Sequence, residues 1–326
     1  MSFSECEVSR DYSPFADFAD DELYAQALAN RGISAQHKYS NDALPQTVLS
    51  NILKAPVEVR PAVFASLYAH EGQERWNKAP YATHTLRAMS SMMILTGQAD
   101  AVTDSETGMK RFFDRLDMLS FSAIGPQDIR AATEGSVLHD AFEDSLEKMN
   151  HLRARGIYVP KIHEDSITLA EDKLATPDEF GTVVGKIEYS RSSAKGEKGL
   201  LTVAGKFVDT HDNSNPDHVP GEKRGKFAVS LTRYVDFYNT LLCKWGGDAM
   251  EDIEARSEAV RSLYPDEGMF KEIVGKYYEI IPVGRSEEID PGQLAVASVE
   301  LAIAEYGYVP NERVSAEIAK LKELPR

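Results

Sequence analysis

Apolar side chains recur at spacings of three and four residues along most of this chain, which is the pattern of α-helices that bury one face. Runs in which apolar and polar residues alternate, as in half-buried strands, are hard to find. We therefore predict an all-α fold. The predicted helices span residues 20–32, 45–54, 57–71, 81–95, 135–150, 199–213 and 227–245, followed by three or four amphipathic helices in residues 246–326.

Residues that favour helix ends and loops divide this pattern. Asp20 or Asp21 can cap the first helix and Gly32 can end it, while Pro80 opens the helix that begins at residue 81. The segments expected to be less regular are an extended lead-in at residues 1–19, an insertion at residues 98–126 with a helix near residues 109–119, and a polar, mobile loop at residues 190–198.

Composition narrows the class of protein. The 326 residues carry a net charge of -16, which argues against a general nucleic-acid or membrane-surface binder, because both need clustered lysine and arginine. The two cysteines, Cys6 and Cys243, lie far apart, so we expect free thiols in a reducing cytoplasm. The longest apolar runs are far too short for a membrane span, and the first residues lack the pattern of a signal peptide. A cytoplasmic globular protein is therefore expected.

Residues 135–150 combine helical periodicity with charged side chains that suit metal binding. His139, Asp140, Glu143 and Asp144 fall within six residues, and on one helix they would share a strip of its surface. The apolar flank that would bury this helix consists of Leu138, Phe142, Leu146 and Met149. Burying three carboxylates beside an imidazole is costly unless a cation compensates them, so the pattern indicates a metal and water-activating site. The alternative is a solvated acidic helix face, which a chain this rich in acids also produces by chance.

Two other segments add to this chemistry. A basic loop contains Arg75 and Lys78, and His84 follows near the start of the next helix. Further along the chain, Asp209 and Asn213 lie one helical turn apart. The three segments together supply two histidines, several carboxylates and a local group of cations.

Taken in order, these three segments resemble the hydrolase domain of the RelA/SpoT family. This family is a branch of the HD metal-dependent phosphohydrolases and degrades (p)ppGpp, the alarmone of the stringent response. The matching motifs are His-Glu-Gly-Gln at residues 70–73 with Pro-Tyr-Ala-Thr-His at 80–84, Leu-His-Asp-Ala-Phe-Glu-Asp at 138–144, and Lys-Phe-Val-Asp with a following Asn at 206–213. The Glu-Asp pair after His-Asp distinguishes this branch from other HD proteins. The resemblance covers about residues 55–245.

The resemblance implies an HD-domain helical bundle with one divalent metal, Mn2+, in its site. The implied metal ligands are His84, His139, Asp140 and Asp209. Glu143 and Asp144 would orient and deprotonate the attacking water. The reaction would release pyrophosphate from the 3' position of (p)ppGpp and leave GDP or GTP.

The substrate contacts and the domains are implied in the same way. The residues expected to contact the nucleotide are Arg75, Lys78, Asn213, Arg224 and Tyr234. For Arg75 the alternative is an ordinary solvated side chain, and for Tyr234 the alternatives are Tyr238 or packing in the core. The implied domains are an N-terminal helical extension at residues 1–54, the phosphohydrolase core at 55–245, and a C-terminal helical extension packed on the core at 246–326.

Other interpretations of the same residues stay open. The substrate can be another nucleotide, such as an adenine alarmone, the 2'-phosphate of NADPH or a nucleoside polyphosphate. A protein that senses a nucleotide without hydrolysing it is a second alternative, although the pair of Glu143 and Asp144 argues for catalysis. The expected partner is a small nucleotide rather than a nucleic acid or a membrane, and the sequence leaves open whether the chain forms a homo-oligomer.

Overall fold

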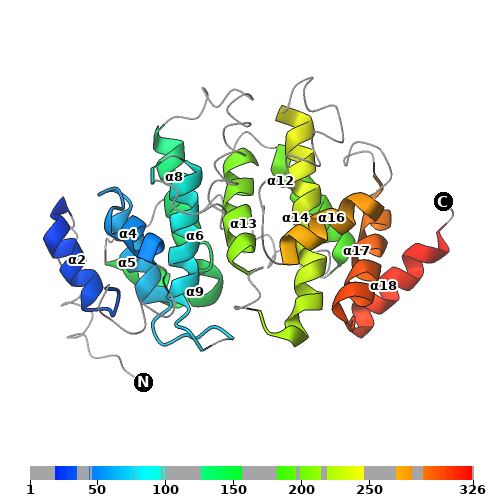
Figure 1. Cartoon of the computed structure of the whole chain (residues 1–326), viewed down its shortest axis with the longest axis horizontal. Helices are drawn as coiled ribbons and strands as arrows, with labels where there is room; N and C mark the ends of the chain where they lie inside the picture. The colour runs from blue at the N-terminus through cyan, green and yellow to red at the C-terminus, as the bar shows by residue number, and fades with distance from the viewer. Residues whose placement is uncertain are drawn as a thin grey trace.

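The computed structural model describes residues 19–34, 44, 46–76, 78–96, 98–99, 126–155, 182–195, 199–213, 219–245, 269–280 and 289–324. Within these ranges the chain forms helices and an isolated bridge between Glu74 and Pro80, with no β-strand. The all-α prediction is therefore confirmed (Figure 1). None of the described helices is long and apolar enough to cross a lipid bilayer.

Most helices lie close to their predicted positions. In chain order they are α2 (Asp21–Ala29), α4 (Gln46–Leu53), α5 (Arg60–Ala69), α6 (Ala82–Leu95), α8 (Pro126–Leu138), α9 (Ala141–Ala154), α12 (Val183–Lys195), α13 (Gly199–Asn213), the 3-10 helix η3 (Gly221–Lys223), α14 (Arg224–Trp245), α16 (Met269–Ile280), α17 (Pro291–Tyr306) and α18 (Glu312–Glu323). Asp20 caps α2 by accepting hydrogen bonds from the backbone of Glu22 and Leu23. Gly32 has a φ of 78°, a conformation that glycine adopts without strain and that turns the chain away from α2.

Helix α6 lies between two hydrophobic cores. The N-terminal core is formed by apolar residues of α2, α4, α5, α8 and α9, and the C-terminal core by those of α12, α13, α14, α16, α17 and α18. One side of α6 joins the N-terminal core through Leu86, Met89 and Met93, and the other side joins the C-terminal core through Ala88, Met92 and Leu95. Nearly every residue of α6 is buried, so this helix is a rigid support for the side chains placed on it.

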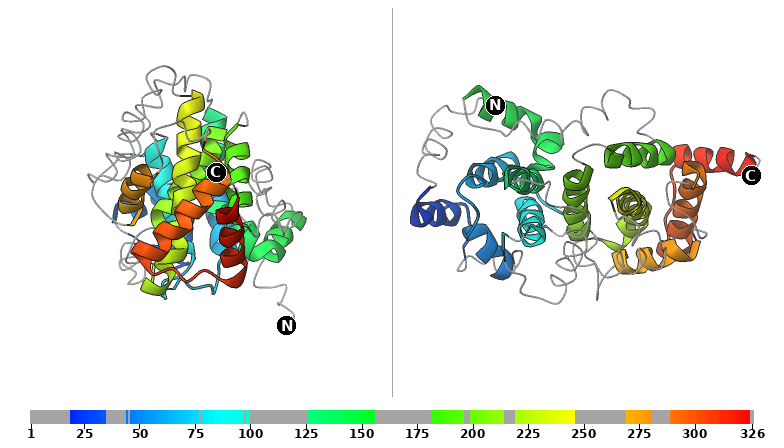
Figure 2. Two further views of the ribbon diagram at one scale, coloured as in Figure 1. Left: turned by 90° about the vertical axis from the view of Figure 1, so that its right-hand side faces the viewer. Right: turned by 90° about the horizontal axis from the view of Figure 1, so that it is seen from above.

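Helix α13 connects the two halves. It packs against α6 and α8 on one side and against α12 and α14 on the other (Figure 1). Seen from above, α14 stands amid α12, α13, α16 and α17, each of which contacts it (Figure 2). The face of α13 that meets α6 carries Asp209 and Asp212, and both are buried. The fold therefore places carboxylates between helices that are distant in the sequence.

The C-terminal helices α17 (Pro291–Tyr306) and α18 (Glu312–Glu323) pack against the helices around α14. Helix α17 packs against α14 and α12, and α18 packs against α17. Glu317 of α18 accepts hydrogen bonds of 2.9 Å from the backbone N–H groups of both Val183 and Val184, which begin α12. A carboxylate at this position satisfies free N–H groups and suits the positive end of the helix dipole. Three helices are thus described in residues 246–326, where three or four were predicted.

The prediction of one continuous helix over residues 135–150 is wrong. Helix α8 ends and α9 begins on either side of His139 and Asp140, which lie in the turn between them. The carbonyl of Ser136, the acceptor that position 140 would use in a continuous helix, accepts a hydrogen bond of 2.7 Å from Nδ1 of His139. Within α9 the backbone leaves helical geometry again at Ser145, with φ -147° and ψ 40°. The turn, and not helical spacing, therefore directs His139 and Asp140.

Other predicted segments have different outcomes. The loop predicted at residues 190–198 is wrong in its first part, because α12 continues to Lys195. The lead-in up to residue 18 lies outside the described residues, as do most of the insertion at residues 98–126 and the helix predicted within it. The division into domains stays a prediction.

Candidate metal centre

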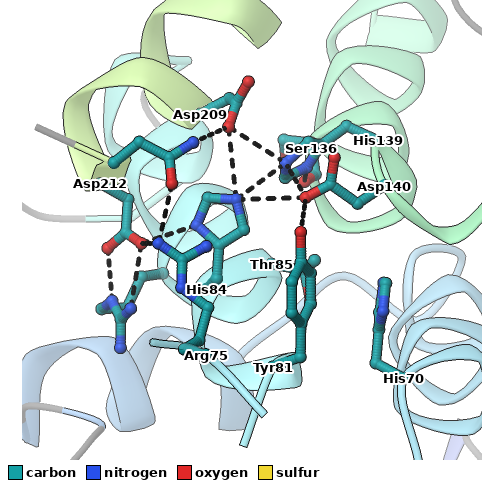
Figure 3. A network of polar contacts seen from close by, with 12 residues as sticks. His70, Arg75, Tyr81, His84, Thr85, Ser136, His139, Asp140, Asp209 and Asp212 are labelled. Carbon is teal, nitrogen blue, oxygen red and sulfur yellow. Dashed lines mark hydrogen bonds and ion pairs between the residues drawn. The ribbon is translucent and has the colours of Figure 1, made fainter. Parts of the chain in front are cut away.

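Three of the predicted ligands converge on one point. His84 lies in the first turn of α6, and the turn between α8 and α9 supplies His139 and Asp140. Nε2 of His84 is 3.0 Å from Nε2 of His139, and Oδ2 of Asp140 lies 3.3 Å from the first nitrogen and 3.1 Å from the second (Figure 3). Side chains whose ligand atoms lie this close together can hold a metal ion.

Asp209 of α13 faces the same point. Its Oδ1 lies 3.3 Å from Nε2 of His84 and 3.3 Å from Nε2 of His139. Nδ2 of Asn213 donates to this oxygen at 2.7 Å, and Nζ of Lys206 is 3.5 Å from the other carboxylate oxygen. All four predicted metal ligands are therefore neighbours, although they come from three separate segments of the chain (Figure 3).

Hydrogen bonds on the far side of each imidazole decide which nitrogen faces the centre. Nδ1 of His139 contacts the Ser136 carbonyl at 2.7 Å, and Nδ1 of His84 contacts a carboxylate oxygen of Asp212 at 2.6 Å. Both partners can only accept, so each Nδ1 carries the proton. Each Nε2 of a neutral ring then presents a lone pair, and two lone pairs 3.0 Å apart repel unless positive charge lies beside them. Imidazole nitrogens with carboxylate oxygens are donors that divalent transition metals accept, so these residues fit the implied metal.

The carboxylates also act on the protonation of the two imidazoles. Burial lowers the pKa of His84, but its contacts with Asp140, Asp209 and Asp212 outweigh that effect and raise the pKa to about 9. Burial likewise lowers the pKa of His139, and the charges of Asp140 and Asp209 raise it well above its ordinary range. A divalent cation held by these nitrogens would have to displace such protons, so its binding would release protons and would strengthen as the pH rises.

Asp212 and Arg87 hold His84 in place, and sequence reasoning missed both. Arg87 lies one turn after His84 on α6, and its guanidinium binds both carboxylate oxygens of Asp212, with Nη2 to Oδ2 at 3.0 Å. Burial raises the pKa of Asp212, but Arg87 and His84 outweigh it and hold the pKa well below its usual range. The signal that reveals the pair is the i to i+3 spacing of His84 with Arg87 on one helix and of Asp209 with Asp212 on the other.

A second support lies beside Asp140. The hydroxyl of Tyr81 donates to Oδ2 of Asp140 at 2.8 Å, and the imidazole of His70 stacks on the Tyr81 ring with centroids 4.6 Å apart (Figure 3). Nδ1 of His70 contacts Oε1 of Gln73, Nε2 of Gln73 donates to Ser145, and Ser145 donates to the last backbone carbonyl of α5. Because that carbonyl only accepts, the direction of every hydrogen bond in this series is fixed, and Nδ1 of His70 carries the proton. Nε2 of His70 is buried without a hydrogen-bond partner among the described residues.

His70 is expected to make the protein less stable in mild acid. Burial lowers its pKa from 6.5 to about 4, although the hydrogen bond to Gln73 opposes this shift. The unfolded chain therefore binds the proton at a higher pH than the folded protein. Between these two pKa values, the free energy of unfolding falls by about 1.4 kcal/mol for each unit by which the pH is lowered. When the pH falls from about 7.5 to about 5, the free energy of unfolding measured in urea should fall by roughly 2 kcal/mol more for the metal-free wild type than for His70→Gln. Parallel losses in the two proteins would contradict a buried, neutral imidazole.

The predicted catalytic pair, Glu143 and Asp144, lies in the first turn of α9. Asp144 is exposed in the first turn, and its backbone N–H donates to the Asp140 carbonyl at 2.8 Å. Burial raises the pKa of Tyr81, and the charges of Asp140 and Asp144 raise it further, so Asp144 lies within electrostatic reach of the ring that supports Asp140. The side chain of Glu143 lies outside the described residues.

The predicted substrate contacts fall into two groups. Arg75 and Asn213 join the network around the ligands, because Nη2 of Arg75 donates to Oδ1 of Asn213 at 2.8 Å. Lys78 and Arg224 are exposed, and Tyr234 packs against the C-terminal core. In the described part of the chain, no hydrogen bond or ion pair joins these last three residues to the four ligands.

The three segments that carry the motifs thus form one centre in the fold. Two imidazoles and two carboxylates face one another there, which is the chemistry of a candidate site for a divalent cation. Comparison of the chain with protein-family models, with curated proteins and with solved structures gave no match.

Proposed function

We propose that this protein is a metal-dependent phosphohydrolase that removes pyrophosphate from the 3' position of (p)ppGpp and leaves GDP or GTP. The observation that carries the proposal is the meeting of two imidazole Nε2 atoms with carboxylate oxygens of Asp140 and Asp209 at 3.0–3.3 Å. The choice of nucleotide is supported by the order of the three motifs, which resembles the RelA/SpoT hydrolase domain. The two distant cysteines favour a reducing compartment, so we place the activity in the cytoplasm.

The four ligands would hold one divalent cation, for which we propose Mn2+. A cation held there would polarise a substrate phosphate and make a nearby water more acidic. Tyr81 fixes the carboxylate of Asp140, and Asp212 fixes the ring of His84. Such hydrogen bonds preorganise ligands and raise their affinity for metal.

Glu143 and Asp144 would act on the attacking water. They lie in the first turn of α9, directly after the turn that carries His139 and Asp140. Carboxylates in this position can orient a water and accept its proton. The first turn of α9 directly follows the turn that carries His139 and Asp140, which supports the proposal that the metal ligands and the base act at the same phosphate.

Exposed cations border the same region. Trp76, on the loop before α6, packs edge-on against Phe227 in the first turn of α14, with ring centroids 5.3 Å apart. This contact brings the loop with the exposed Lys78 close to the start of α14, where Lys223 and Arg224 are also exposed. A group of cations suits a nucleotide with several phosphates, because each phosphate adds negative charge to be compensated.

A panel of nucleotides tests the proposed function. The full chain is incubated with Mn2+ and with ppGpp, pppGpp, an adenine alarmone, NADPH or GTP in separate reactions, and the release of phosphate and of pyrophosphate is measured separately. We expect pyrophosphate from ppGpp and pppGpp, and no release after EDTA removes the metal. Release of orthophosphate from NADPH or GTP alone would show that the protein acts on a different substrate. Binding of a nucleotide without any release would show that it is a sensor, and either result overturns the proposal.

A further inference from the structure

Arg75 is held inside the protein, on the loop between α5 and α6. Only 5% of its side chain is exposed, and its guanidinium lies 5.8 Å from the ring centroid of Trp76 and 5.5 Å from that of Tyr81. The backbone of the loop is fixed as well, because the Arg75 N–H donates to the Ala79 carbonyl at 2.8 Å and the Lys78 N–H donates to the Arg75 carbonyl at 2.9 Å. Aromatic and backbone contacts therefore keep the guanidinium in one place.

One nitrogen of Arg75 reaches two residues that contact metal ligands. Its Nη2 donates to Oδ1 of Asn213 at 2.8 Å. The same nitrogen lies 3.9 Å from Oδ2 of Asp212 (Figure 3). Asn213 in turn donates from Nδ2 to Oδ1 of Asp209 at 2.7 Å. Asp212 accepts from Nδ1 of His84 at 2.6 Å. Arg75 is thus one residue removed from two of the four ligands.

The contacts with Arg75 and Asp209 together decide which way the Asn213 amide faces. The amide has an acceptor on one side and a donor on the other, and half a turn of the group exchanges them. Arg75 can only donate, so it keeps the amide oxygen on its own side and turns the nitrogen toward Asp209. Asp209 accepts from the amide nitrogen and favours the same orientation, but without the guanidinium the amide oxygen loses its partner, and the amide is held less firmly against Asp209. Asp212 is less dependent on Arg75, because Arg87 also binds it.

We propose that Arg75 is a positioning residue of the metal centre. It raises the affinity for the divalent cation by orienting Asn213 toward Asp209, and its charge lies beside the Asp212 carboxylate that holds His84. The inference rests on the proposed metal site, and it assigns Arg75 a task other than the nucleotide contact expected from the sequence. Removal of a hydrogen-bond partner of a metal ligand, such as Asn213, typically lowers metal affinity by about 10- to 100-fold, and this sets an upper bound for Arg75, which acts through Asn213.

Cation binding to variants of the full chain tests this inference. The Kd for Mn2+ is measured by isothermal titration calorimetry on the wild type, Arg75→Ala and Arg75→Lys. The matched control is Arg130→Ala, which removes an arginine that pairs with Glu134 on α8. We expect Arg75→Ala to weaken Mn2+ binding by up to about 10-fold, the lower end of the effect of losing a ligand's own hydrogen-bond partner, Arg75→Lys to recover part of the loss, and Arg130→Ala to match the wild type.

A double-mutant cycle with Asn213→Ala shows how the effect is transmitted. If Arg75 acts through Asn213, the loss caused by Arg75→Ala shrinks when Asn213 is already absent. A loss of full size in both backgrounds overturns this route. Arg75→Ala with Mn2+ binding as tight as that of the wild type overturns the inference and leaves the proposed function standing, whereas a wild type that binds no Mn2+ overturns both. Circular dichroism checks folding, and Arg75→Lys carries the same comparison if the alanine variant does not fold.

Discussion

Replacement of Asp140 by alanine is expected to remove the bound cation and the activity together. Asp140 places a carboxylate oxygen 3.3 Å from Nε2 of His84 and 3.1 Å from Nε2 of His139, so its loss deprives the centre of a charged ligand. The affinity for Mn2+ should fall by more than the roughly 10- to 100-fold that the loss of a ligand's hydrogen-bond partner costs. Metal analysis after dialysis and pyrophosphate release from ppGpp measure the two effects on the same preparation.

His211→Ala is the matched control for this experiment. His211 lies on α13 between Asp209 and Asp212, yet it is not one of the predicted ligands. This variant should keep its metal and its activity. Full metal content in Asp140→Ala would contradict the assignment of Asp140 as a ligand.

Exchange of Glu143 and Asp144 for their amides is expected to stop turnover while the metal stays bound. Glu143→Gln with Asp144→Asn preserves the shape of both side chains but removes their ability to accept a proton at neutral pH. Turnover of ppGpp should fall by roughly a hundred-fold to ten-thousand-fold, which is the usual contribution of general acid-base catalysis. Measurement of kcat beside the Kd for Mn2+ separates the loss of chemistry from a loss of metal.

Glu147→Gln tests whether any acid on α9 has the same effect. Glu147 is exposed on the same helix, beyond the bend at Ser145. It should leave kcat unchanged, because it lies outside the turn that follows the ligands. Near-normal turnover in the double amide variant would show that Glu143 and Asp144 serve the structure and not the reaction.

Periodicity located helices well wherever the signals for their ends are local. Helices α2, α4, α6 and α14 begin and end within a few residues of the predicted positions. Asp20 and Gly32 act on the backbone next to them, so their effect can be inferred from the sequence alone. The residue types and the order of the motifs likewise predict a metal site, and His84, His139 and Asp140 do lie close enough together to hold a metal ion.

The break between α8 and α9 could not be predicted from periodicity. Apolar residues continue at helical spacing across it, from Leu138 to Met149, so the pattern favours one helix. At the break, Nδ1 of His139 donates to the carbonyl of Ser136, which a continuous helix would use for the N–H of residue 140. Such competition between a side chain and the backbone depends on geometry that spacing does not show.

Pairs of residues from distant parts of the chain also could not be predicted from the sequence. Arg87 and Asp212 are 125 positions apart and meet only because α13 packs on α6. The sequence left two interpretations of Arg75 open, a solvated side chain or a nucleotide contact. In the structure Arg75 is buried against Asn213, which is 138 positions away. Contacts of this kind are set by helix packing, which no local pattern specifies.

Anomalous diffraction tests most directly whether this centre holds a metal. A crystal of the wild-type protein grown with Mn2+, measured near the manganese absorption edge, should show an anomalous peak within bonding distance of Nε2 of His84, Nε2 of His139 and Oδ2 of Asp140, with Asp209 as the fourth ligand. Mn2+ bound only elsewhere on the protein, or no peak at these atoms, would contradict the metal centre on which the proposed hydrolase depends.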